Sequence, residues 1–89
     1  MQKINLDLAY MHSKEELHVY LKEVLNLPHY YGDNLDALYD SLTENSEAME
    51  ITIPEDVQED EYLGDYGLQL LCVFQDAAAV NDALLIRIE

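Results

Sequence analysis

Three short apolar segments, near the beginning, the middle and the end of this 89-residue chain, place the strongest limit on its fold. Residues 2–8 and 48–53 alternate apolar and polar side chains, which is typical of strands with one buried face, and residues 83–89 form a third such segment. Helical patterns separate them, and strands separated by helices pair in parallel through right-handed crossovers. The sequence therefore predicts an α/β fold, a small three-stranded parallel sheet packed with helices, in one domain over residues 1–89.

The first helix is expected to begin after Ser13, because Ser13 and Glu16 have the spacing of a capping box. Apolar residues then recur at helical spacing as far as Leu25. Asn26-Leu27-Pro28 is expected to end this helix, because Pro28 disfavours helical geometry at Leu27 and cannot continue the pattern.

The last helix is expected to begin at Gly67 and to end near Asn81, where turn-forming residues follow. Its pattern consists of Leu68, Leu71, Cys72, Phe74, Gln75, Ala78 and Ala79. Residues 55–65 are mostly acidic, with few apolar anchors, and predict a loop or a short helical turn.

A second helix is expected within residues 30–44, with two distinct faces at 100° per residue. The apolar stripe consists of Leu35, Leu38 and Leu42, with Tyr39 at its border. The acidic face spans roughly 80° and consists of Asp33, Asp36, Asp40 and Glu44.

This acidic face is unfavourable by itself. The break at Tyr31-Gly32 supplies an N-cap at Asp33, and the helix dipole favours the early acids, but Asp40 and Glu44 gain nothing from the dipole. Acids four residues apart repel one another, and residues 29–49 contain no Lys or Arg. The pattern suggests a basic partner; a solvated face of an acidic protein is the alternative.

The charge balance points in the same direction. Four Lys and Arg against 19 Asp and Glu give a net charge of −15, which excludes direct binding to a phosphate backbone and favours a basic partner. Such charge also keeps a small protein in solution. The apolar fraction of 49% indicates a folded chain rather than a disordered acidic tail.

The single cysteine, Cys72, cannot form an internal disulfide and is expected to be a buried, inert thiol. Residues 1–8 are too polar for a signal peptide, and no apolar run reaches membrane-spanning length. We expect a cytoplasmic protein without a membrane partner.

Two enzymatic alternatives use the same acids. Asp36 and Asp40 could act as a carboxylate pair, and with Asp33 they could bind a hard cation, although the spacing matches no calcium loop. The three histidines do not have zinc-site spacing. Three tyrosines are expected to flank the acidic face, where Tyr often contributes to interfaces: Tyr30, Tyr31 and Tyr39.

Residues 27–43 read Leu-Pro-His-Tyr-Tyr-Gly-Asp-Asn-Leu-Asp-Ala-Leu-Tyr-Asp-Ser-Leu-Thr. This segment closely resembles the barstar signature, in which a Tyr-Tyr-Gly turn leads into Asn-Leu-Asp-Ala-Leu, an aromatic residue and an aspartate. Residues 72–77 are also similar to the family, whereas residues 44–67 match poorly and have been remodelled.

The resemblance implies a barstar-like fold and a cytoplasmic inhibitor that is neither an enzyme nor dependent on a cofactor. Its partner would be a basic, extracellular or toxin ribonuclease of the barnase type, bound by a monomer in a 1:1 complex. In this family the second helix occludes the nuclease active site, and its acids mimic phosphates.

By the same resemblance, Asp40 enters among the catalytic cations of the enzyme and Asp36 pairs with a further basic residue. Tyr30 packs on the active-site rim. Asn34 and Thr43 supply hydrogen bonds, and Asp76 supplies a peripheral ion pair.

The sequence departs from the family at Tyr39, where a tryptophan is usual, and at Glu44 and Asn45, where glycine and tryptophan are usual. These residues are expected to affect the choice of nuclease more than the mode of inhibition. Protection against the cell's own secreted ribonuclease and immunity to a delivered toxin both stay open. So do an acidic adaptor for a basic non-nuclease protein and a carboxylate- or metal-dependent enzyme.

Overall fold

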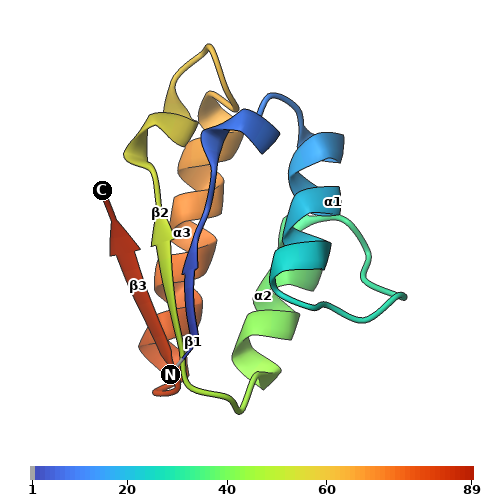
Figure 1. Cartoon of the computed structure of the whole chain (residues 1–89), viewed down its shortest axis with the longest axis vertical. Coiled ribbons are helices and arrows are strands. Elements are labelled where there is room, and N and C mark those ends of the chain that lie inside the picture. The colour runs from blue at the N-terminus through green and yellow to red at the C-terminus, as the bar shows by residue number, and fades with distance from the viewer. Residues whose placement is uncertain (1) are drawn as a thin grey trace.

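The computed structural model describes residues 2–89 and contains a three-stranded parallel sheet in the order β1, β2, β3 (Figure 1). The strands are β1 (Gln2–Asn5), β2 (Met49–Ile53) and β3 (Leu84–Ile88). Ile4 lies opposite Ile51, which lies opposite Ile86. The predicted α/β class and the parallel pairing are confirmed.

One face of the sheet is covered by helices and the other is open. The helical elements are the 3-10 helices η1 (Leu8–Tyr10) and η2 (Glu55–Gln58) and the α-helices α1 (Lys14–Val24), α2 (Leu35–Glu44) and α3 (Asp65–Val80). In Figure 1, α3 lies behind the sheet, and α3 also packs against α2. Ile51 and Ile53 of β2 are buried with Leu38, Leu70 and Phe74 of these helices. The side chains of Glu50, Leu85 and Arg87 lie on the opposite, outer face.

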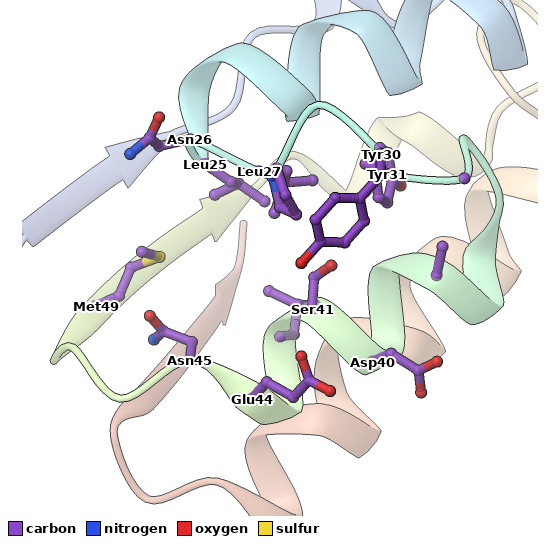
Figure 2. A pocket seen from close by; sticks show the side chains of 14 residues that line it. Leu25, Asn26, Leu27, Tyr30, Tyr31, Asp40, Ser41, Glu44, Asn45 and Met49 are labelled. Carbon is purple, nitrogen blue, oxygen red and sulfur yellow. The ribbon is translucent and has the colours of Figure 1, made fainter.

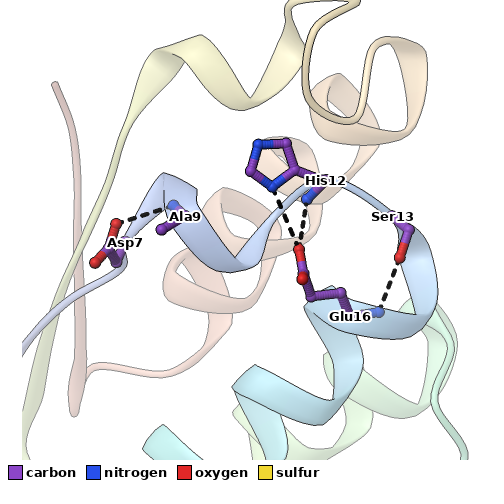
Figure 3. Close-up of polar contacts among 5 residues, drawn as sticks. All are labelled: Asp7, Ala9, His12, Ser13 and Glu16. Carbon is purple, nitrogen blue, oxygen red and sulfur yellow. Dashed lines mark hydrogen bonds and ion pairs between the residues drawn. The ribbon is translucent and has the colours of Figure 1, made fainter.

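The first strand is shorter than the predicted 2–8, because Asp7 caps η1. The Asp7 carboxylate accepts a hydrogen bond from the Ala9 backbone N–H at 2.9 Å (Figure 3). Leu6 is nevertheless buried, and Leu8 packs against the core from η1. The apolar alternation therefore identified buried positions correctly, but a local side-chain hydrogen bond ended the strand early.

Helix α1 begins as the sequence predicts. The Ser13 hydroxyl accepts from the Glu16 backbone N–H at 3.1 Å, while the Glu16 carboxylate accepts from the backbone N–H of His12 at 3.0 Å rather than that of Ser13 (Figure 3). The Glu16 carboxylate also lies 3.5 Å from His12 Nδ1. This arrangement satisfies two N–H groups at the start of α1 in a shifted form of the capping box.

The predicted end of α1 at Asn26-Leu27-Pro28 is confirmed, since the last helical residue is Val24 and Leu25 is the C-cap. Asn26 has a left-handed φ of 53°, and the Leu27 N–H donates to the Lys22 carbonyl at 3.0 Å. These are the features of a Schellman C-cap, for which Asn is a suitable residue. The chain has already turned away from the helix when it reaches Pro28.

The poorly matching segment before α3 contains η2 and a series of turns, as the prediction of short helical structure implied. α3 begins at Asp65, so Gly67 lies in its first turn. A Cβ atom at Gly67 would collide with the Val57 carbonyl, and glycine thus allows α3 to pack directly on the backbone after β2. No helix within residues 2–89 is both long enough and apolar enough to cross a membrane.

The residues whose pattern predicted α3 are only partly buried. The helix buries Leu70, Leu71, Phe74 and Ala77, whereas Leu68 and Gln75 are exposed. Cys72 is also exposed, against the expectation of a buried thiol. Twelve of the sixteen residues of this helix are apolar or small, so the sequence pattern did not define which side faces the core.

Candidate functional site: an acidic helix face and its preceding loop

Helix α2 is capped by Asn34, not by Asp33. The Asn34 side chain accepts from the Ala37 backbone N–H at 2.8 Å and donates to the Gly32 carbonyl at 3.0 Å. Asp33 has a left-handed φ of 54° and precedes the helix. The predicted acidic face therefore loses Asp33 as a helical member. The Asn34 side chain is used within the chain, where it holds the first turn of α2.

Asp36, Asp40 and Glu44 form what we call the acidic row, three exposed carboxylates at intervals of four residues along α2. Carboxylates at this spacing lie on one side of a helix, about 6 Å apart along its axis. The ion pairs among residues 2–89 join Lys3 to Glu50, Arg87 to Glu50, and His12 to Glu16, and none includes the acidic row.

The few basic residues lie elsewhere. Lys3 and Arg87 are next to Glu50 on the outer face of the sheet. Lys14 lies over the Tyr66 ring, with its Nζ 4.8 Å from the ring centre. Lys22 donates to the His29 carbonyl at 3.1 Å. The acidic row thus has no pairing cation within residues 2–89 and is available for external cations.

The loop of residues 26–34, which we call the entry loop, forms one wall of a groove beside α2. The groove has a volume of about 490 Å³, and Figure 2 shows the Tyr30 ring near Ser41, with Asp40 and Glu44 on either side of Ser41 along α2. Tyr30 is 79% exposed and stands at the groove edge. An exposed aromatic ring next to unpaired carboxylates can contact a basic protein through both its ring face and their charge.

The remaining predicted residues have different positions. Tyr39 is half-buried against the core, and Asp76 is exposed on α3, the helix that packs against α2. The Thr43 hydroxyl donates to the Asp40 carbonyl at 3.1 Å. Tyr31, expected beside the acidic face, is instead 7% exposed and belongs to the core.

The part of the chain that the structure describes, residues 2–89, contains no group of three His, Cys, Asp or Glu side chains arranged to hold a metal ion. Asp33 does not continue the helical row of Asp36 and Asp40. The predicted cation-binding alternative therefore lacks the convergent oxygen ligands that it requires.

The sequence pattern gave no role to His18, which the structure places at the centre of three elements. His18 of α1 is 2% exposed, and its two ring nitrogens contact the hydroxyls of Tyr31 and Tyr66. Burial lowers the pKa of His18 and raises the pKa of both tyrosines. Its spacing from Leu21 and Leu25 on the apolar side of α1 was the signal that could have revealed it.

Comparison with known proteins finds a protein family and a bacterial relative. The family model described as "Barstar (barnase inhibitor)" matches residues 1–87. A Bacillus subtilis (strain 168) protein with the name "Putative ribonuclease inhibitor YrdF" is 37% identical over 78 residues, which covers 86% of each chain.

Proposed function

The chain belongs to the barstar family, and from this membership we propose that it is a protein inhibitor of a basic ribonuclease of the barnase type, without catalytic activity of its own. The observation that carries the proposal is the acidic row, whose three carboxylates have no pairing cation within residues 2–89. A ribonuclease active site holds cationic side chains for RNA phosphates, and carboxylates on a rigid helix can occupy the same positions.

Asp40 is the central contact in this proposal. It lies in the middle of the acidic row and beside the groove, so it can enter a concave active site while Asp36 and Glu44 remain within reach of its edges. The gain on binding includes relief of the repulsion between neighbouring carboxylates on α2. The enzyme is inhibited because the helix excludes RNA from the active site.

Tyr30 and Glu44 would extend the contact on either side of Asp40. Tyr30 supplies a large exposed ring at the groove edge, and rings of this kind often form interface centres. Glu44 adds a charge at the C-terminal end of α2, next to Asn45, which also lines the groove. We propose that these two residues, with Tyr39, select the cognate nuclease.

The other site residues would act less directly. Asn34 holds the start of α2 through its cap, and the Thr43 hydroxyl can also accept a hydrogen bond from a partner. Asp76 on α3 would add a peripheral ion pair. The complex would contain one copy of each protein, and the nuclease would be either a secreted enzyme of the same cell or a delivered toxin.

The proposal is tested by titrating purified barnase with this protein while recording both binding and RNA cleavage. Native protein is expected to inhibit cleavage at a 1:1 ratio, and Asp40→Ala is expected to lose most of that inhibition. Glu61→Ala is the matched control, because Glu61 is an exposed acid outside the acidic row.

Equal losses for the two substitutions would show that net charge, rather than the acidic row, carries recognition. A folded protein that neither binds nor inhibits any barnase-type enzyme would contradict the proposal. The acidic adaptor, with a basic non-nuclease partner, would then be the better hypothesis.

A further inference from the structure

The entry loop is attached to the core at one buried side chain. Tyr31 is the only buried residue from Asn26 to Asn34, and Leu27 and Pro28 are half-buried. Residues at both ends of the loop, Asn26 and Asp33, have left-handed backbone conformations. A loop with so few apolar contacts opens easily unless a specific interaction holds it.

The buried end of Tyr31 is hydrogen-bonded to α1. His18 Nδ1 lies 2.7 Å from the Tyr31 hydroxyl, and His18 Nε2 lies 2.6 Å from the Tyr66 hydroxyl of α3. The Tyr31 hydroxyl also donates to the Asn34 carbonyl at 3.4 Å. The same carbonyl accepts from the Leu38 N–H at 3.0 Å, which is the first hydrogen bond of α2.

These hydrogen bonds can all form together in one arrangement. When the Tyr31 O–H donates to the Asn34 carbonyl, the Tyr31 oxygen accepts from His18, and a neutral ring then carries its proton on Nδ1. Nε2 is left as an acceptor for the Tyr66 O–H. The result is a series of three hydrogen bonds, donated in turn from Tyr66 to His18, from His18 to Tyr31 and from Tyr31 to Asn34. It connects α3, α1 and the entry loop to the N-cap of α2.

We propose that His18 is a positioning residue for the partner-binding surface: through the Tyr31 hydroxyl it holds the entry loop, and with it Tyr30 and the first turn of α2, in the conformation that binds. This inference rests on the proposed function for its effect on affinity. Its effect on the loop concerns the free protein alone. Prior ordering increases affinity, because the loop then loses less conformational freedom on binding.

The surroundings of His18 agree with a neutral ring. Burial lowers its pKa, although the nearby carboxylates of Asp33 and Glu15 act in the opposite direction. The hydroxyls that face it belong to Tyr31 and Tyr66, and Lys14 Nζ lies over the Tyr66 ring. The hydrogen bonds from Tyr66 to His18 and from His18 to Tyr31 require a neutral ring with one donor and one acceptor.

The matched test removes one oxygen atom at a time. Tyr31→Phe and Tyr66→Phe each leave one His18 nitrogen without its partner, so both are expected to lower stability. Only Tyr31→Phe disconnects the entry loop. We expect Tyr31→Phe to raise the Kd for barnase by about tenfold, since a positioning hydrogen bond is lost, and Tyr66→Phe to change it by no more than about twofold.

Hydrogen exchange of the free variants tests the loop without any nuclease. Amides of residues 29–34 are expected to exchange faster in Tyr31→Phe than in Tyr66→Phe, and nitrogen NMR of native His18 is expected to show the Nδ1–H tautomer. If native protein does not bind barnase but these two results hold, the proposed function fails and the positioning role stands.

The inference is overturned if the two variants weaken barnase binding equally. It is also overturned if Tyr31→Phe leaves exchange of residues 29–34 unchanged. A purely space-filling role for His18 would produce either of these two results.

Discussion

The carboxylates of Glu50 and of the acidic row lie on two different surfaces of the chain. Glu50 has cationic partners within the chain, and the acidic row has none within residues 2–89. Glu50 lies in the central strand, with a side chain only 12% exposed, and its carboxylate accepts from Arg87 Nε at 2.6 Å and lies 3.9 Å from Lys3 Nζ. The hydrogen bond from Arg87 is the main cause of its lowered pKa. Asp36, Asp40 and Glu44 are exposed and have no such partner within residues 2–89.

The charge of Glu50 is neutralised by contacts within the fold, whereas the charges of the acidic row remain free to meet a partner. Half of the four basic residues in the sequence are placed around the single carboxylate of Glu50, where they link the outer strands to the central one. The acidic row keeps its repulsion, which only an external cation can relieve. A surface that remains unneutralised in a protein with such a small basic content is well suited to a basic partner.

The largest predicted effect is on affinity for barnase, which should depend on the acidic row and not on Glu50. Asp40→Ala is expected to raise the Kd for barnase at least about 30-fold, as loss of a central hot spot does, because the cations of the enzyme lose their partner. Glu50→Ala should leave the Kd within about twofold, since Glu50 lies on the outer face of the sheet. Calorimetric titration of both variants makes the measurement, and a similar loss for Glu50→Ala would remove the distinction.

The acidic row should also control the rate of association. Raising the salt concentration from 50 to 500 mM is expected to slow association with barnase about tenfold, because salt screens the attraction between separated charges. Stopped-flow mixing measures the rate. The variant Asp36→Asn/Asp40→Asn should depend less on salt, whereas Glu50→Gln should keep the native dependence. Identical salt dependence in all three proteins would mean that the whole chain, not the row, steers association.

His18 and Glu50 should lose their contributions to stability over different pH ranges. The pKa of His18 is lowered from 6.5 in the folded protein, so the unfolded chain binds the extra proton first as the pH falls. The contribution of His18 to the free energy of unfolding is therefore complete above pH 6.5. It decreases as the pH falls toward and through the pKa of His18 in the folded protein. The contribution of Glu50, whose pKa is lowered from 4.5, decreases only below about pH 4.5 by the same argument.

Urea unfolding between pH 7 and pH 5 tests this assignment. His18→Phe should be less stable at pH 7 and should show a weaker pH dependence over that range, whereas Glu50→Gln should keep the native pH dependence there. The groups that face His18, Glu15 and Asp33 among them, are unchanged in both variants. An unaltered slope in His18→Phe would mean that another group is responsible.

The smallest effect concerns the cost of the acidic row to the free protein. Asp40→Asn/Glu44→Gln is expected to raise the free energy of unfolding by about 0.5 kcal/mol, because it removes like-charge pairs and a charge at the unfavourable end of the helix dipole. Glu50→Gln should have the opposite sign, since Arg87 loses its partner. Urea denaturation curves at low salt measure both. Destabilisation by the double variant would show that the row contributes to folding.

Much of the fold could be predicted from local patterns. The strand alternation around Ile4 and Ile51 and the helical separation of the strands were sufficient for a parallel sheet, and Ser13 was sufficient for the start of α1. The row of Asp36, Asp40 and Glu44 followed from helical spacing alone. Its members are exposed in the structure because no apolar side chain interrupts that side of α2.

Errors arose where several conformations satisfy the same pattern. Asp33 adopts a left-handed conformation, which moves it off the start of α2 and leaves Asn34 as the cap. Asp tolerates that conformation but does not require it. The mostly apolar character of α3 likewise did not reveal that Cys72 is exposed.

The sequence by itself determined the elements and the charge of the acidic row, because hydrophobic periodicity and charge spacing act over a few neighbouring residues. Tertiary structure decided which carboxylates found cations, since Arg87 reaches Glu50 only through the pairing of β2 with β3. It also joined His18, Tyr31 and Tyr66, which are separated by up to 48 positions in the chain. Such contacts depend on how whole elements pack, and no local pattern contains that information.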